Sequence, residues 1–268
     1  MELTHEMLKA VQKIELEMLL EVDRICKENH IKYTLIGGTL LGAVRHGGFI
    51  PWDDDADIAM LRPEYEKFCS VIDEKLDSSR FYFQNIEKTE GYRWGYAKLR
   101  RKGTLFVREN QEHMKYEQGI FLDIFPIDGT PDNRILRKIH KFRCFCVRKI
   151  LWSKVGKRAS RSRLQCVIYS ILSMIPDKII KKMYRGLILK CHSNTSEVVR
   201  TLTYPAPKKL DGYYRRWFAE TSPIMFEGYE FEGVKDYQGW LRYEFGDYMK
   251  LPPEDKRKAH PVTAIKFV

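Results

Sequence analysis

The stretch GGTLLGAVRHGGFIPWDDDADIAM, residues 37–60, decides the fold. An apolar run from Ile31 to Ile36 precedes it and is typical of a strand, and Thr39 can cap a short helix from Leu40 to Arg45. After the glycine turn at residues 46–48, a second strand is expected around residues 55–60. This order of strand, short helix and acidic strand is typical of an α/β domain.

Alternation along the second strand divides the acidic residues. Side chains two positions apart share a face of a strand, so Asp55 and Asp57 point the same way, and Asp53 joins them if the strand begins early. Carboxylates side by side repel, and burying them unpaired costs several kcal/mol. A divalent cation removes that conflict, and oxygen ligands favour Mg²⁺ or Mn²⁺.

A third strand, Gly119 to Phe125 before Pro126, supplies one more carboxylate. Asp123 is its only charged residue and interrupts an apolar run. It is therefore predicted to join the metal site, although a salt-bridged structural aspartate would give the same pattern.

The glycines before the acidic strand predict a phosphate site. Gly37 and Gly38 let a phosphate approach the backbone, and the following helix start at Thr39 supplies free N–H groups. Further predicted phosphate contacts are Arg45, His46 and Lys98, each of which a solvated surface role would also explain.

The rest of the first half is also α/β. A helix capped by Thr4 is expected over residues 8–25, and another from Pro63 to Leu76. Strands are expected at 81–86, at 93–99 and at 104–107, the last two paired around a turn at 100–103. The sequence thus predicts a mixed sheet flanked by helices, with a catalytic core over residues 1–130.

A basic helical segment is expected at residues 131–200. Between Arg134 and Lys190 there are 17 Lys and Arg against one acid, Asp177, so this stretch carries +16 and the rest of the chain −5. Apolar residues recur at helical spacing among the bases, as in helices that lie on anionic membranes. A solvated surface and nucleic-acid binding are the alternatives, and no nucleic acid is expected. Residues 201–268 are rich in aromatics and are expected to pack on the core and complete the substrate cleft.

The termini and cysteines bear on location. No segment is long and apolar enough to span a bilayer, and the N-terminus lacks the pattern of a signal peptide. The six cysteines follow no disulfide or zinc spacing and are expected to be reduced thiols. The predicted location is the cytoplasm, at the inner face of the membrane.

Residues 38–58 resemble the signature of the LicD family of phosphocholine transferases, which belongs to the nucleotidyltransferase superfamily and is related to the fukutin-related proteins. The likeness extends through Tyr96-Ala-Lys-Leu99, Leu122-Asp-Ile-Phe-Pro126, Phe226-Glu-Gly228 and Tyr243-Glu-Phe-Gly-Asp-Tyr248 with Leu251-Pro-Pro253. Phe245 stands where relatives often have tyrosine, a conservative change.

The resemblance implies a reaction. Such enzymes transfer the phosphoryl-alcohol of CDP-choline, or of a similar CDP-alcohol, to a hydroxyl of a glycan that can be lipid-linked, and they release CMP. The implied metal ligands are Asp55, Asp57 and Asp123, and Asp53 is a further ligand or the general base. Positioning and charge neutralisation carry most of the chemistry of such a transfer.

Choline is a quaternary ammonium that aromatic faces bind. The candidate walls of its cage are Trp52, Trp94, Tyr96, Tyr213, Tyr214 and Trp217, most of which are expected to be core residues. Two other functions stay open, a nucleotidyltransferase acting on a sugar or other small acceptor and a membrane-associated scaffold without activity. The acceptor, the alcohol and the oligomeric state are open as well.

Overall fold

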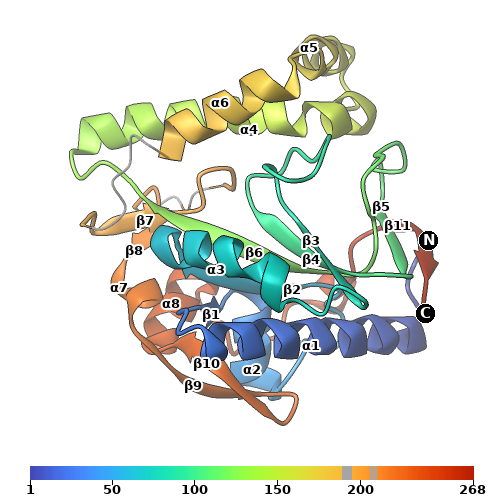
Figure 1. Ribbon diagram of the computed structural model, residues 1–268, viewed down its shortest axis with the longest axis vertical. Helices are drawn as coiled ribbons and strands as arrows, with labels where there is room; N and C mark the ends of the chain where they lie inside the picture. The colour runs from blue at the N-terminus through green and yellow to red at the C-terminus, as the bar shows by residue number, and fades with distance from the viewer. Residues whose placement is uncertain (189–194, 206, 208–209) are drawn as a thin grey trace.

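A computed structural model describes residues 1–188, 195–205, 207 and 210–268 (Figure 1). Its central sheet has the strand order β3-β4-β6-β2-β1-β10-β9. β2 runs parallel to β6 and β1 to β10, and the remaining pairs on this path are antiparallel, which confirms the predicted mixed sheet. The strands are β1 (Thr34–Leu35), β2 (Ala56–Leu61), β3 (Phe81–Gln84), β4 (Ala97–Arg101), β6 (Phe121–Gly129), β9 (Thr221–Phe226) and β10 (Tyr229–Val234).

Four short strands lie off this path. β7 (Val198–Arg200) pairs with the end of β6, and β8 (Tyr213–Tyr214) pairs with β7. β5 (Leu105–Arg108) and β11 (Val262–Lys266) form a separate two-stranded ribbon. The prediction that residues 93–99 pair with residues 104–107 is therefore wrong. β4 lies between β3 and β6, which occupy both of its edges, so β5 finds its partner at the C-terminal end of the chain.

Two helices cover one face of the sheet. α1 (His5–Glu28) starts at the predicted cap, where the Thr4 hydroxyl accepts a hydrogen bond from the N–H of Met7. α3 (Arg62–Lys75) has Pro63 in its first turn, as predicted. Figure 1 shows both helices in front of the sheet, and their backbones contact β2, β4 and β6. Ile58, Leu122 and Ile124 are fully buried in the main core.

Several boundaries differ from the prediction, among them the following three. The strand expected at residues 31–36 pairs with β2 only at Thr34 and Leu35. α2 (Gly37–His46) begins at Gly37, so Thr39 lies within its first turn and is not its cap. Pro126 does not end β6, because it lies between Ile124, the last residue paired with β4, and Asp128, the first paired with β7. A strand tolerates a residue without an N–H where its edge has no partner.

The basic segment is helical, as predicted. α4 (Arg134–Ala159), α5 (Arg163–Ser173) and α6 (Asp177–Ile188) form a layer at one end of the molecule (Figure 1). A second core joins α4 and α6 to loops of the sheet, with Cys144, Leu151 and Tyr184 against Tyr92 and Tyr116. None of the helices in the described ranges is long and apolar enough to cross a membrane.

The C-terminal segment is part of the sheet itself. It contributes β9 and β10 to the central sheet and β11 to the ribbon, together with α7 (Arg216–Ala219), α8 (Tyr237–Phe245) and the short η1 (Glu254–Lys256). Five cysteines are free thiols, namely Cys26, Cys69, Cys144, Cys146 and Cys166, and Cys191 lies outside the described residues.

Candidate active site

A row of polar side chains crosses the sheet on the face opposite α1 and α3. Asp57 of β2 pairs in register with Asp123 of β6, Asp123 with Lys98 of β4, and Lys98 with Gln84 of β3. Residues in register share a face, so the alternation that predicted a common direction for these carboxylates operates across strands as well. Lys98 Nζ lies 2.5 Å from Asp123 Oδ1 and 3.3 Å from the centre of the Phe121 ring.

Lys98 is therefore held by a protein carboxylate, although it was predicted to contact phosphate. Burial lowers the pKa of Lys98 to about 8, and burial also raises the pKa of Asp123. Both shifts favour the neutral forms because the pair is enclosed.

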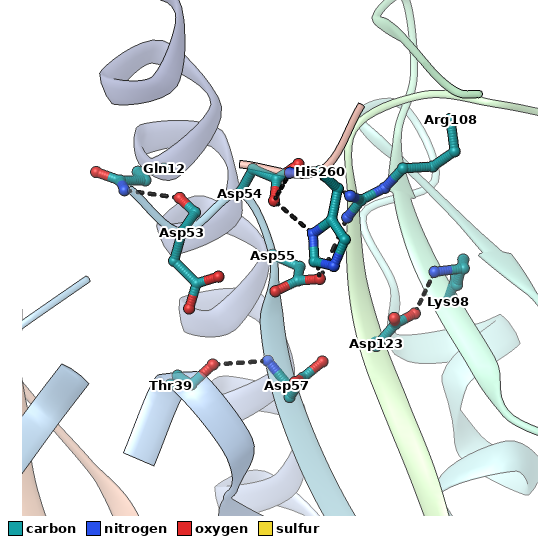
Figure 2. A network of polar contacts seen from close by, with 10 residues as sticks. All are labelled: Gln12, Thr39, Asp53, Asp54, Asp55, Asp57, Lys98, Arg108, Asp123 and His260. Carbon is teal, nitrogen blue, oxygen red and sulfur yellow. Dashed lines mark hydrogen bonds and ion pairs between the residues drawn. The ribbon is translucent and has the colours of Figure 1, made fainter. Parts of the chain in front are cut away.

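The N-terminus of α2 is packed directly against the carboxylates. A Cβ on Gly37 would lie 2.8 Å from Asp57 Oδ2, and one on Gly38 would lie closer still to Asp53 Oδ2. The Thr39 hydroxyl accepts a hydrogen bond of 2.8 Å from the N–H of Asp57 (Figure 2). The absence of a side chain at Gly37 and Gly38 thus allows the carboxylates of Asp57 and Asp53 to lie close to the backbone of α2.

Asp54 is turned away from the row. Arg108 Nη1 donates to Asp54 Oδ2 at 3.0 Å, and His260 lies 2.8 Å from Asp54 Oδ1 through Nδ1 (Figure 2). The other guanidinium nitrogen of Arg108 reaches Asp55 at 3.2 Å. The hydrogen bond with Asp54 raises the pKa of His260. Asp54 therefore anchors the acidic loop to the β5–β11 ribbon.

Two polar residues of α1 support the same loop from behind. Gln12 Nε2 donates to the carbonyl oxygens of Ile50 at 3.2 Å and of Asp53 at 2.9 Å. Glu15 is only 1% exposed, and within the described chain neither of its carboxylate oxygens has a hydrogen-bond partner. Burial, and then the charges of Asp55, Asp54 and Asp53, raise its pKa well above its ordinary value.

Sequence reasoning missed Arg108, His260, Gln12 and Glu15. For the two α1 residues a signal was present, because both lie on the apolar face of that helix. For Arg108 and His260 there was none, since the pairing of β5 with β11 joins positions about 150 residues apart.

The site holds more buried acid than its bases neutralise. Burial, followed by the charges of Asp55 and Asp54, raises the pKa of Asp53 to about 8, and burial raises that of Asp57 well above its ordinary value. Within the described chain, no side chain donates a hydrogen bond to the Asp57 carboxylate. Such a donor set fits a hard divalent cation.

Among the described residues, a close group of possible metal ligands differs from the predicted one. Asp54, Asp55 and His260 offer atoms that all lie within 4.8 Å of one another. Asp54 already accepts hydrogen bonds from Arg108 and His260, and its side chain is inaccessible. Asp55, Asp57 and Asp123 line one cavity and leave more carboxylate oxygen free, so they stay our predicted ligands.

Two cavities meet at Asp57, Phe125 and Tyr204. The smaller, about 230 Å³, lies at the N-terminus of α2 and is lined by Gly37, Gly38 and residues that include Arg200, Tyr213, Trp240 and Glu244. The larger, about 460 Å³, contains Asp55, Asp57, Asp123 and Lys98, with Arg100, Arg108, Trp94 and Tyr96 among its walls. A substrate at Asp57 can therefore extend to either side of the row.

The other predicted contacts lie elsewhere. Arg45 and His46 are in the last turn of α2, where Arg45 donates to the carbonyl of Tyr248 at 2.9 Å, and neither lines these two cavities. Trp52 lines a different cavity, and its ring is covered by the Arg257 guanidinium at 5.5 Å. Of the predicted choline contacts, Trp94 and Tyr96 are in the larger cavity and Tyr213 in the smaller.

Comparisons with known proteins identify the family of the chain. Residues 30–150 match the family model described as LicD/FKTN/FKRP, nucleotidyltransferase domain. Over 95% of its length the chain is 30% identical to the lipopolysaccharide cholinephosphotransferase LicD of Haemophilus influenzae, of which it covers 96%. An uncharacterized protein of Rickettsia typhi is 39% identical over 56 residues, which is 21% of the chain and 18% of that protein. An uncharacterized protein of Rickettsia prowazekii is 44% identical over 48 residues, 18% of each chain. The chain belongs to the LicD family.

Proposed function

We propose that this protein transfers phosphocholine from CDP-choline to a hydroxyl of a cell-surface glycan and releases CMP. The observation that carries the proposal is the nearly full-length similarity to a lipopolysaccharide cholinephosphotransferase, combined with the acidic row built by Asp57 and Asp123. In the reaction the acceptor oxygen bonds to the phosphorus that carries choline. The bond from that phosphorus to the oxygen of CMP breaks, and the acceptor proton passes to a base.

The two cavities suit such a displacement. In-line transfer needs the nucleophile opposite the leaving group, and the cavities lie on two sides of Asp57. We place CMP in the smaller one, where the N-terminus of α2 and Arg200 favour phosphate and aromatic rings favour a base. The larger one, with Trp94 and Tyr96, then receives choline and the acceptor hydroxyl.

Asp55, Asp57 and Asp123 would hold Mg²⁺ or Mn²⁺, which when bound neutralises charge on the transferred phosphoryl group. Lys98 orients Asp123, Arg108 orients Asp55, and Thr39 fixes the backbone of Asp57. Asp53, whose backbone Gln12 holds, is either a further ligand or the base that accepts the proton.

The test measures CMP release from a panel of CDP-alcohols with magnesium, with and without candidate glycans. We expect release from CDP-choline that depends on the glycan, and a loss of at least 100-fold in Asp57→Asn. Asp73→Asn, an exposed aspartate of α3, is the matched control and should keep full activity. A nucleotide attached to the acceptor would instead identify a nucleotidyltransferase. Full cellular function of Asp55→Asn and Asp57→Asn would identify a scaffold.

We also propose that α4–α6, within residues 131–200, attach the protein to the cytoplasmic face of an anionic membrane. The apolar side chains exposed on these helices, and at the C-cap of α5, are Ile135, Leu136, Ile139, Phe142, Phe145, Leu164, Val167, Ile168, Ile171, Met174, Ile179 and Met183. They lie among the bases of the +16 segment, and each base near an anionic leaflet contributes about 1 kcal/mol. A lipid-linked glycan would be reached from this position.

Vesicle co-sedimentation tests this attachment. We expect salt-sensitive binding to anionic but not to neutral vesicles, weakened by Ile139→Ser with Phe142→Ser. Met225→Ser with Tyr229→Ser, two exposed apolar residues of the β9–β10 hairpin, is the control and should bind normally. Equal binding of the two double variants would refute the assignment.

A further inference from the structure

The larger cavity, which contains Asp57 and Asp123, is called the carboxylate cavity below. A third cavity, the α4 cavity, lies beside it. It has a volume of about 310 Å³ and is formed by residues 93–96 before β4, by residues 148, 149, 151 and 152 of α4, and by residues 203–205. Trp94, Tyr96, Trp152 and Tyr204 line both this cavity and the one that contains Asp57 and Asp123. One extended ligand could therefore occupy both.

The α4 cavity combines apolar walls with cationic groups. Leu151, Trp152 and Pro205 are among its apolar walls, and Arg148 and Lys149 are adjacent bases of α4. Arg148 is half-buried and extends over the Phe145 ring at 5.6 Å. The same helix thus carries the exposed apolar side chains and the basic wall of the cavity.

Arg93 provides the clearest sign of a ligand. It is only 7% exposed and lines the α4 cavity. Its Nε donates to Asp177 at 2.7 Å and its Nη2 to the carbonyl of Ile175 at 2.9 Å, but in the described chain its buried Nη1 has no partner. Thr203 of the same cavity is 7% exposed and also keeps a buried hydroxyl without a partner. Leaving a buried donor unpaired is costly, and more so for a charged group.

We propose that the α4 cavity binds a phosphate ester carried on an apolar chain, and that in the cell this ligand is a membrane-anchored acceptor. The phosphate would face Arg93 and Arg148, and the chain would leave along α4 toward the membrane. The sugar attached to the phosphate would then reach the carboxylate cavity past Tyr96 and Tyr204. The identification of this ligand as the acceptor rests on the proposed transfer reaction, but the binding site itself does not.

The binding of dodecyl phosphate tests the site. It is measured by titration calorimetry below the micelle concentration of the compound and without any CDP-alcohol. Dodecyl glucoside and inorganic phosphate separate the contribution of the chain from that of the phosphate. We expect one site per chain, with dodecyl phosphate bound at least tenfold more tightly than either control compound. Arg148→Gln should weaken that binding about tenfold, and Thr203→Val should weaken it by a smaller factor.

Arg143→Gln is the matched control, because Arg143 is also a half-buried arginine of α4 but does not line the cavity. It should bind like the unchanged protein. Equal loss in Arg143→Gln and Arg148→Gln would mean adsorption to the basic surface and would overturn the proposal, as would equal affinity for the glucoside and the phosphate. If the site binds dodecyl phosphate but no CDP-alcohol is consumed, the transfer reaction fails while the site stands.

To identify the source of the phosphate, the same variants are assayed for CMP release with a lipid-linked glycan phosphate and with the glycan alone. We expect Arg148→Gln to raise KM for the lipid-linked acceptor about tenfold and to leave KM for CDP-choline unchanged. Phosphatidylglycerol should compete only weakly. If it competes as well as the lipid-linked glycan, the cavity binds a membrane phospholipid and the acceptor assignment is wrong.

Discussion

Gly38→Ala isolates the contact between α2 and the acidic loop. Gly38 lies in the first turn of α2, and its backbone does not require a positive φ. Alanine inside a helix is more stable than glycine by about 0.5–1 kcal/mol, so helix propensity alone favours the change. The new Cβ, however, would lie well within van der Waals contact of Asp53 Oδ2.

The size of the effect follows from that overlap. Unstrained non-bonded carbon contacts need about 3.5 Å, so the Asp53 carboxylate must move on the order of 1 Å. A displacement of this size among groups that position a substrate costs about 100-fold in rate. We therefore expect kcat/KM for CDP-choline to fall about 100-fold, while the free energy of unfolding changes by less than about 1 kcal/mol.

The assay combines initial rates of CMP release with urea denaturation. Gly186→Ala in α6 is the control, because it is also a helical glycine but a Cβ there meets no atom within 4 Å. It should stabilise the protein slightly and leave the rate unchanged. Activity of Gly38→Ala within threefold of the unchanged protein would refute the role given to this contact.

Three further predictions concern other parts of the molecule. Arg62 is buried and donates two hydrogen bonds of 2.7 Å to the Asp128 carboxylate. Asp128→Ala leaves Arg62 without this counter-charge and should lower the free energy of unfolding by about 3–5 kcal/mol in urea titrations. A loss below about 1 kcal/mol would show that Arg62 finds other partners. Tyr96→Ala should raise KM for CDP-choline more than Trp52→Ala does, because only Tyr96 lines the carboxylate cavity; the reverse order would move the choline site to Trp52. Burial lowers the pKa of His140 to about 4, below its unfolded value, so the contribution of His140 to folding stability should fall as the pH drops from about 6.5 toward 4. In denaturation curves the unchanged protein should therefore lose stability relative to His140→Asn over this range, and a difference between the two that does not depend on pH would contradict the prediction.

The predicted residues of the site are marked by sequence patterns within a single strand, whereas the missed residues depend on which distant strands pair. Strand alternation gave Asp55 and Asp57 a shared direction, and the lone charge in an apolar strand marked Asp123, which the parallel register then places beside Asp57. Those signals lie within single strands. The partners of Asp54 lie in β5 and just before β11, and no local pattern reports which strands pair.

Pro126 and Thr39 show how tertiary structure overrides local rules. Pro126 was expected to stop a strand, but it pairs with Met60 of β2 and lies in the gap between the β4 and β7 pairings, where a residue without an N–H is tolerated. Thr39 was expected to cap a helix, but its hydroxyl accepts from the N–H of Asp57 in the adjacent strand. In each case a contact between segments that are distant in the sequence decides the local structure.

The most direct test of the central claim is the mass of the modified glycan after reaction with CDP-choline and magnesium. We predict that the glycan gains one phosphocholine, that one CMP appears for each, and that Asp57→Asn abolishes both. A glycan that gains cytidine monophosphate, or an Asp57→Asn protein that modifies the glycan as well as the unchanged protein does, would contradict the account.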